Sequence, residues 1–230
     1  MGEKVQRGGP ALLFDLDGTL VDSVYQHVLA WREAFEAAGI ELAVWRIHRR
    51  IGMSGGLIAN AVLREIGRAV TPEEAGKLAS LHAQAYARQA KQIRSLPGAR
   101  ELLAYLTTAN VPWAIATSGR IESAKPTLEA LGVSPAVPVI TRDEVAHAKP
   151  DPDLFLAAAE QLDVPIHAAV VVGDSVWDLL AAQRARALGV GLLSGGYGPD
   201  ELERAGAYRV YQDPADLLQH LDEIGVREAN

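Results

Sequence analysis

The 230-residue sequence contains no cysteine, and this absence sets the first limits on its chemistry. Without thiols there is no disulfide framework, no cysteine nucleophile and no cysteine-ligated zinc. No apolar run approaches the roughly 20 residues needed to span a bilayer. The polar segment at residues 1–7 lacks the apolar core of a signal peptide, and we expect residues 1–9 to form a loose tail. We therefore expect a cytoplasmic protein without a membrane partner.

Positive charge is also scarce, with 22 lysines and arginines against 29 aspartates and glutamates and a formal net charge of −7. Nucleic acids and anionic membranes attract basic proteins, so this balance argues against both as general partners. It is compatible with a small anionic substrate held by a few local cations. Apolar residues make up 49% of the chain, which is ordinary for a globular protein. We expect a monomer or weak homodimer.

Two carboxylates stand one residue apart near the N-terminus: Asp15 and Asp17 follow the apolar run 11–14 and precede Gly18. Burying a carboxylate at the end of an apolar strand is costly, and two so close repel each other. A hard divalent cation held by oxygen ligands would resolve both problems. Asp-x-Asp-Gly is also a common turn, because aspartate and glycine favour turn geometry. These residues alone leave both interpretations open.

The spacing of apolar residues changes along the chain. From Val24 to Lys91 it is helical almost throughout, and Thr71 with Glu74 forms a helix-start pattern. After residue 96, helical stretches alternate with short β-rich runs. Such alternation predicts an α/β fold with a mostly parallel sheet covered by helices on both faces. The expected strands are 11–16, 113–116, 137–140, 168–172, 190–193 and 208–211.

This change of pattern divides the chain into two predicted domains. We expect residues 1–22 and 96–230 to form a Rossmann-like catalytic core. Residues 23–95 are then a helical cap domain, inserted after the first strand. The two hinges are expected at residues 20–23 and 94–98.

Polar groups follow four of the expected strands. In open parallel sheets, ligands bind beyond the carboxyl ends of the strands. All four sets suit one task, which is to hold a phosphate beside a metal ion. In chain order they are Asp15 with Asp17, Thr117 with Ser118, Lys149, and Asp174 with Asp178.

These four ordered motifs resemble those of the haloacid dehalogenase superfamily, in the phosphatase branch with a helical cap after the first strand. Proteins similar to β-phosphoglucomutase and phosphoglycolate phosphatase belong to this branch. The resemblance implies that Asp15 attacks phosphorus as the nucleophile and that Asp17 protonates the leaving alcohol. Dehalogenases of this superfamily lack a carboxylate at the second position. The presence of Asp17 therefore argues for phosphoryl transfer and against carbon–halogen cleavage.

The resemblance also implies a metal site. Mg²⁺ would be bound by the carboxylates of Asp15 and Asp174 and by the backbone carbonyl of Asp17, since few protein ligands and oxygen coordination suit this ion. Asp178 would support the site through water or a hydrogen bond, or would be an ordinary first-turn helix aspartate. We do not count it as a direct ligand.

The remaining core motifs are expected to bind the phosphate. Thr117 and Ser118 should donate hydrogen bonds to the phosphoryl oxygens. Lys149 should neutralise negative charge on the phosphate and on Asp15.

Substrate specificity is expected to reside in the cap. The stretch 46–55 concentrates cations and ends in glycines, so Arg49 or Arg50 is expected to hold a second anionic group, with an exposed basic helix end as the alternative. His27, on the first cap helix, is expected to contact the substrate or the hinge. His82 has no motif around it, and a surface or packed position is expected.

The leading hypothesis is a Mg²⁺-dependent phosphatase that hydrolyses a small phosphorylated metabolite through an aspartyl-phosphate intermediate. Sugar phosphates and phosphoglycolate are the expected substrate types. The alternative is a hexose phosphomutase similar to β-phosphoglucomutase, which would interconvert isomers and release little phosphate. A non-catalytic phosphate-binding module is a third hypothesis, but such a module needs neither a nucleophile nor an acid/base.

Overall fold

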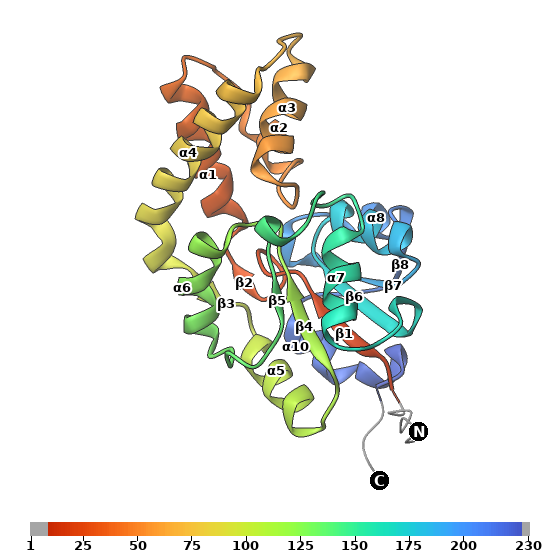
Figure 1. Ribbon diagram of the computed structural model, residues 1–230. Coiled ribbons are helices and arrows are strands. Elements are labelled where there is room, and N and C mark those ends of the chain that lie inside the picture. Colours follow the sequence, from red (N-terminus) through yellow and green to blue (C-terminus); the bar gives the residue numbers. More distant parts are fainter. Residues whose placement is uncertain (1–8, 227–230) are drawn as a thin grey trace.

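The chain forms a sheet flanked by helices, with a separate group of helices beyond one end of the sheet (Figure 1). The computed structural model describes residues 9–226, so the tail expected at residues 1–9 lies outside it except for Gly9. Within this range, no helix combines the length and the apolar composition that a membrane span requires.

The main sheet has six strands, all paired in parallel, in the order β5-β4-β1-β6-β7-β8. The first strand lies inside the sheet, where Leu12 pairs with Trp113 on one side and Val170 on the other. The predicted α/β class with a mostly parallel sheet is confirmed. The strands are β1 (Ala11–Phe14), β4 (Trp113–Ala116), β5 (Val139–Ile140), β6 (Ala169–Gly173), β7 (Leu188–Leu192) and β8 (Ala207–Tyr211).

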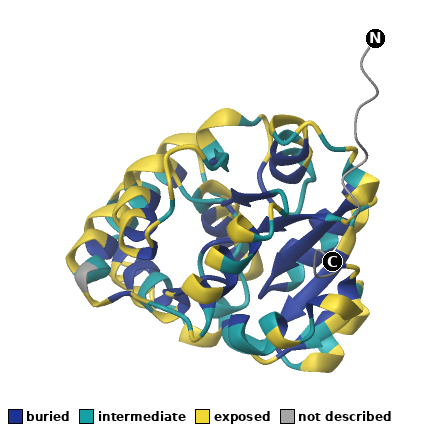
Figure 2. Cartoon of the chain, turned by 90° about the horizontal axis from the view of Figure 1, so that it is seen from below, coloured by how far each residue is buried: buried dark blue, intermediate teal, exposed yellow. Residues whose placement is uncertain are grey.

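Apolar side chains cover both faces of this sheet, because neighbouring residues of a strand point to opposite sides. Leu12 belongs to a buried cluster with Leu102 and Leu217 of the helices on one face. Leu13 belongs to a second cluster with Phe155 and other helix residues on the opposite face. Figure 2 shows the buried strands inside and the exposed surfaces on the outer sides of the helices. Burial on both faces explains why the strand sequences are continuously apolar.

In the described part of the chain, six helices lie around the sheet; all but α10, which follows the last strand, lie between successive strands in the chain. They are α5 (Ala99–Thr108), α6 (Ile121–Leu131), α7 (Asp153–Gln161), α8 (Val176–Ala185), α9 (Pro199–Arg204) and α10 (Pro214–Gln219). Short 3₁₀ turns are η1 (Ala90–Gln92), η2 (Arg142–Glu144), η3 (Ile166–Ala168), η4 (Leu193–Gly195) and η5 (Leu221–Ile224).

The group of helices at the top of Figure 1, which we call the cap, has its own apolar cluster, in which Trp31, Ile47, Ile58 and Leu78 are buried. The start of its last helix follows the predicted capping pattern: the backbone N–H groups of Thr71 and Glu74 donate to each other's side chains. The cap helices are α1 (Val24–Ala37), α2 (Val44–His48), α3 (Gly55–Glu65) and α4 (Pro72–Gln89).

The two chain segments that connect cap and core pair with each other. Strand β2 (Val21–Asp22) runs antiparallel to β3 (Arg94–Ser95), with Val21 opposite Ser95. These are the segments in which the sequence analysis placed the hinges. The paired strands hold the start and the end of the inserted helices side by side.

Candidate active site

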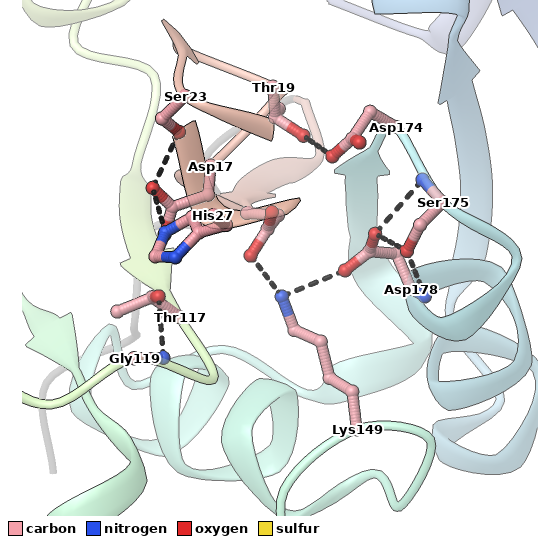
Figure 3. Close-up of polar contacts among 11 residues, drawn as sticks. Asp17, Thr19, Ser23, His27, Thr117, Gly119, Lys149, Asp174, Ser175 and Asp178 are labelled. Atoms are coloured by element: carbon pink, nitrogen blue, oxygen red, sulfur yellow. Dashed lines mark hydrogen bonds and ion pairs between the residues drawn. The ribbon is translucent and has the colours of Figure 1, made fainter. Parts of the chain in front are cut away.

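The polar motifs meet at one edge of the sheet (Figure 3). Asp15 follows the last residue of β1, Thr117 follows β4, and Asp174 follows β6. Because these three strands are parallel neighbours in the sheet, their carboxyl ends lie at the same edge. Lys149 comes from the loop that precedes α7 and extends toward the same point.

Lys149 is completely buried, and its ammonium group lies between two carboxylates. Its Nζ donates to Asp15 Oδ1 in a short contact and lies 2.8 Å from Asp178 Oδ1. The other oxygen of Asp178 accepts from the backbone N–H and the hydroxyl of Ser175, at 3.1 and 2.5 Å. Both oxygens of Asp178 are therefore engaged within the protein, and this aspartate holds Lys149 in position.

Asp174 lies in a tight cradle. Thr19 Oγ1 donates to Asp174 Oδ1 at 2.9 Å. Gly18, with φ of +88°, and Gly195 approach the other oxygen so closely that a Cβ would lie 2.4 and 1.9 Å from Oδ2, respectively. Side chains at these two glycines would displace the carboxylate, so both positions need glycine for steric reasons.

Burial shapes the electrostatics of this cluster. It raises the pKa of Asp15 to about 7; Lys149 opposes the rise, while Asp178 and Asp17 add to it. Burial also raises the pKa of Asp174 well above its ordinary value, with further increases from the charges of Asp178 and Asp15. For Lys149, burial lowers the pKa, but Asp15 and Asp178 outweigh it, so the net shift is upward and the ammonium stays charged.

This cluster fits a divalent cation. Carboxylate oxygens of Asp15, Asp174 and Asp178 lie within 4.8 Å of one another, and all three residues are buried. With all three carboxylates ionised, Lys149 would leave an excess of two negative charges, and this excess contributes to the raised pKa values of Asp15 and Asp174. Oxygen donors with an excess of negative charge are what hard divalent cations bind. Since Asp178 is occupied by Lys149 and Ser175, Asp15 and Asp174 are the carboxylates best placed to hold the ion.

Asp17 has a different environment on the side of the cluster facing the cap. Its Oδ1 accepts from Ser23 Oγ at 2.6 Å and lies 3.2 Å from His27 Nε2 and 3.5 Å from the Tyr86 hydroxyl. Burial raises the pKa of Asp17, but the charge and hydrogen bond of His27 and the hydrogen bond from Ser23 bring it below the ordinary value. The pKa values of Asp15 and Asp17 are thus shifted in opposite directions, up for Asp15 and down for Asp17. Such a pair is typical of sites in which two carboxyl groups take different acid/base roles.

Comparison with known proteins assigns this site to a family, because the family model described as haloacid dehalogenase-like hydrolase matches residues 10–186. The chain belongs to this family. The match covers β1 through α8 and so includes all the motif residues, and it confirms the resemblance inferred from the sequence.

Several similar haloacid dehalogenase-like proteins are phosphatases by name. Hexitol phosphatase A of Escherichia coli (strain K12) is 32% identical over 177 residues, covering 75% of this chain and 78% of the relative. Validoxylamine A 7′-phosphate phosphatase of Streptomyces hygroscopicus subsp. limoneus is also 32% identical, over 78% of this chain and 84% of the relative. Phosphoglycolate phosphatase of Rhodospirillum rubrum is 30% identical, over 90% and 88%.

Solved structures show the same architecture. A hydrolase from Pseudomonas syringae superimposes with a TM-score of 0.92 at 57% identity, covering 94% of this chain and all of the other. A β-phosphoglucomutase from Clostridium difficile gives a TM-score of 0.82 at 23% identity, covering 94% and 96%. The second likeness concerns the fold alone.

In this haloacid dehalogenase-like protein, a cavity of about 1090 Å³ lies between this edge of the sheet and the cap, and Asp15, Asp17, Thr117 and Ser118 line it. Thr117 Oγ1 accepts from the backbone N–H of Gly119 at 3.0 Å, which leaves its hydroxyl hydrogen able to donate. Ser118 Oγ is buried and has no hydrogen-bond partner among the described residues. Both hydroxyls are therefore available to an anion in the cavity.

The cap places His27 against Asp17 and His82 against His27. His27 stacks on Tyr86 with ring centroids 3.9 Å apart, and its Nδ1 lies 3.1 Å from His82 Nε2. His82 in turn stacks on Trp31 at 4.4 Å. His27 lies against Asp17, and its contact with the substrate or the hinge stays a prediction. His82 also lines the cavity, although the sequence analysis gave it no role. The one available signal was helical spacing: His27 and Trp31, like His82 and Tyr86, are four residues apart on facing helices.

Arg50, expected to bind substrate, is placed elsewhere. Its guanidinium forms a short ion pair with Glu65 of α3, and Arg50 is absent from the described residues that line the cavity. Arg49 is also engaged outside the cavity, where its guanidinium pairs with Glu201 and lies over the ring of Tyr197. These arginines hold the cap together and hold it against the core.

Proposed function

We propose that the protein is a Mg²⁺-dependent phosphatase that hydrolyses monoesters of small phosphorylated metabolites through a phosphate ester of Asp15. The observation that carries this proposal is the pairing of Asp15 with the buried Lys149, next to a cavity with free hydroxyl donors. Phosphatase-named relatives at 30–32% identity support it.

In the first step, a carboxylate oxygen of Asp15 attacks phosphorus, and the bond between phosphorus and the leaving oxygen breaks. Asp17 gives its proton to that oxygen, so the leaving group departs as an alcohol. The low pKa of Asp17 keeps it ionised in the free protein, but a phosphate dianion arriving beside it raises that pKa, because like charges disfavour ionisation.

In the second step, water attacks the phosphorus atom of the aspartyl phosphate while Asp17 takes a proton from it. The bond to Asp15 breaks, phosphate leaves and the carboxylate is regenerated. Lys149 lies beside Asp15 throughout, and Thr117 and Ser118 donate to the phosphoryl oxygens. When bound by the carboxylates of Asp15 and Asp174 and the backbone carbonyl of Asp17, Mg²⁺ supplies positive charge that offsets the phosphoryl group's negative charge.

Phosphate release from a panel of phosphorylated metabolites, with p-nitrophenyl phosphate as a general substrate, tests this proposal. Asp15→Asn removes the nucleophile while nearly preserving shape, so kcat should fall at least about a thousandfold with the fold unchanged by circular dichroism. Asp200→Asn, at an exposed position of α9, is the matched control and should retain full activity. Retained turnover in Asp15→Asn would contradict the mechanism.

The same assay addresses the alternative functions. A hexose phosphomutase would interconvert sugar phosphate isomers and release little phosphate, and a phosphate-binding module would release none. Cytoplasmic location and a monomer or weak homodimer stay predictions from the sequence, which fractionation and size-exclusion chromatography can test.

A further inference from the structure

The cavity above Asp15 is large for a small substrate. Ligand pockets that bury drug-sized molecules have volumes of roughly 300–1,000 Å³, and this cavity measures about 1090 Å³. A phosphate ester with a two-carbon leaving group would fill only a small part of it. The size therefore favours a leaving group considerably larger than glycolate.

Among the described residues, the cap side of the cavity carries no lysine or arginine, and its His27 is already paired with Asp17. Helix α4 contributes Ala75, Ala79 and Ala83, and the ring of Trp31 closes the wall behind His82. Burial lowers the pKa of His82 well below its ordinary value, so its imidazole is neutral. This wall is apolar or weakly polar and has no group to pair with a carboxylate.

The arginines of the cap's basic stretch are directed elsewhere. Arg46 and Arg50 both pair with Glu65, and Arg49 pairs with Glu201. None of these three arginines is among the described residues that line the cavity. A second anionic group on the substrate would find no cation on this side.

The core side of the cavity is balanced in charge. Arg120 pairs with Asp143 at 3.0 Å, and Arg142 donates to the backbone carbonyl of Val145 at 2.6 Å. Glu122 lies in the same rim. Two arginines and two acids thus leave no net positive charge beyond the phosphate-binding edge.

From size and charge together, we propose that the natural substrate is a phosphate monoester of a bulky, uncharged alcohol, such as a sugar or polyol, and not of a hydroxy acid. This inference rests on the proposed phosphatase function. A carboxylate on the leaving group would lose its water against the cap without gaining a partner, and such a loss is unfavourable. A neutral ring or chain would instead pack against the alanines of α4.

A substrate panel tests this, with p-nitrophenyl phosphate, a hexitol monophosphate and 2-phosphoglycolate assayed with Mg²⁺. We expect kcat/KM to be at least about tenfold higher for the hexitol phosphate than for 2-phosphoglycolate. Hydrolysis of p-nitrophenyl phosphate with a preference for 2-phosphoglycolate would overturn the substrate class alone. No hydrolysis of any ester would overturn the proposed function itself.

A matched pair of variants on α4 tests whether this wall of the cavity contacts the leaving group. Ala83 is exposed and lines the cavity, whereas Ala87, one turn further on, is exposed outside the described lining. Ala83→Arg should raise kcat/KM for 2-phosphoglycolate about fivefold, the gain typical of one partly exposed ion pair. Ala87→Arg should leave this kcat/KM unchanged. Equal effects of both variants, or none from Ala83→Arg, would contradict the assignment of this wall to the leaving group.

Discussion

Lys149 and Arg50 are both cations that the sequence analysis assigned to anionic groups of the substrate, Lys149 to the phosphate and Arg50 to a second anionic group, and their surroundings differ sharply. Lys149 has no exposed side-chain surface and touches the carboxylates of Asp15 and Asp178. The side chain of Arg50 is 27% exposed, and its ionic partner is Glu65. The ammonium group of Lys149 is buried beside the proposed nucleophile Asp15, whereas the guanidinium of Arg50 forms an ion pair within the cap.

This difference shows how the two regions divide the work. At the sheet edge, low solvent exposure strengthens every charge, so a few residues dominate binding and chemistry. On the cap, each solvent-screened ion pair contributes at most about 1 kcal/mol to stability. We infer that the cavity wall on this side selects the substrate by its shape. Chemistry should therefore respond strongly to changes at the edge and weakly to changes in the cap arginines.

Among the variants that test this comparison, the largest effect is expected for Lys149→Met. The variant leaves Asp15 and Asp178 buried without their cation, which should destabilise the fold by about 3–5 kcal/mol. Loss of positive charge beside the phosphoryl group should also lower kcat at least about a hundredfold. Urea denaturation and phosphate release measure the two effects, and Lys125→Met on α6, at an exposed position, is the control. Near-normal turnover in Lys149→Met would contradict the stronger role that we assign to the buried charge at the sheet edge.

Metal binding should come next and should depend on pH. The pKa of Asp15 is raised to about 7, above its unfolded value of 3.8. Between pH 3.8 and pH 7, the metal-free folded protein therefore keeps a proton on Asp15 that the unfolded chain has lost. The contribution of Asp15 to stability is thus fully present below pH 4 and is lost as pH rises through 7. A bound cation holds the carboxylate ionised and competes with that proton.

Excess Mg²⁺ should therefore stabilise the fold more at pH 8 than at pH 6. At pH 8, a hundredfold excess over Kd should contribute about 2.7 kcal/mol. Thermal denaturation with and without Mg²⁺ across this range measures the effect. The Asp15→Asn variant should show a smaller Mg²⁺ effect with a weaker pH dependence, because only Asp174 then has a raised pKa at the ion. A metal-induced Tm shift that is constant from pH 5 to 8 would contradict the assignment.

The sheet edge was predictable from the sequence because its geometry follows from local rules. Apolar runs such as 113–116 become buried strands, parallel strands end together, and whatever follows them meets at one edge. Asp15, Asp174 and Lys149 come together for this reason. The short helix α2 and the paired strands β2 and β3 were not predicted as elements, since tertiary contacts decide elements of two to five residues.

The cap was less predictable because its side-chain partners depend on how helices pack. The sequence shows that Arg50 lies in a basic stretch, but not that α3 presents Glu65 to it. Likewise His82 lies 55 residues after His27, and only the packing of α1 against α4 brings their rings together. No sequence motif predicts either of these two contacts.

A moderate effect is expected for His82→Phe. The Nε2 of His27 faces Asp17 and its Nδ1 lies 3.1 Å from His82 Nε2, so the contact with His82 fixes the orientation of the His27 ring. Phenylalanine keeps the stacking on Trp31 but removes the hydrogen bond, which is worth about 1 kcal/mol or a fivefold decrease in kcat. KM should be unchanged, and His82→Gln, which retains a donor, should recover part of the loss. Equal kcat in both variants would show that His82 only packs.

The smallest effect is expected for Arg50→Ala, which sharpens the comparison from the cap side. If the guanidinium serves only Glu65 and the ring of Trp177, its loss should lower the free energy of unfolding by less than about 1 kcal/mol. Because Arg50 is outside the described cavity lining, kcat and KM should stay within about twofold of the parent protein. Steady-state kinetics on the best substrate of the panel measures both constants, and Glu65→Ala should match Arg50→Ala in stability. A tenfold rise in KM from Arg50→Ala alone would mean that this arginine leaves Glu65 to bind substrate, and the cap would then recognise charge as well as shape.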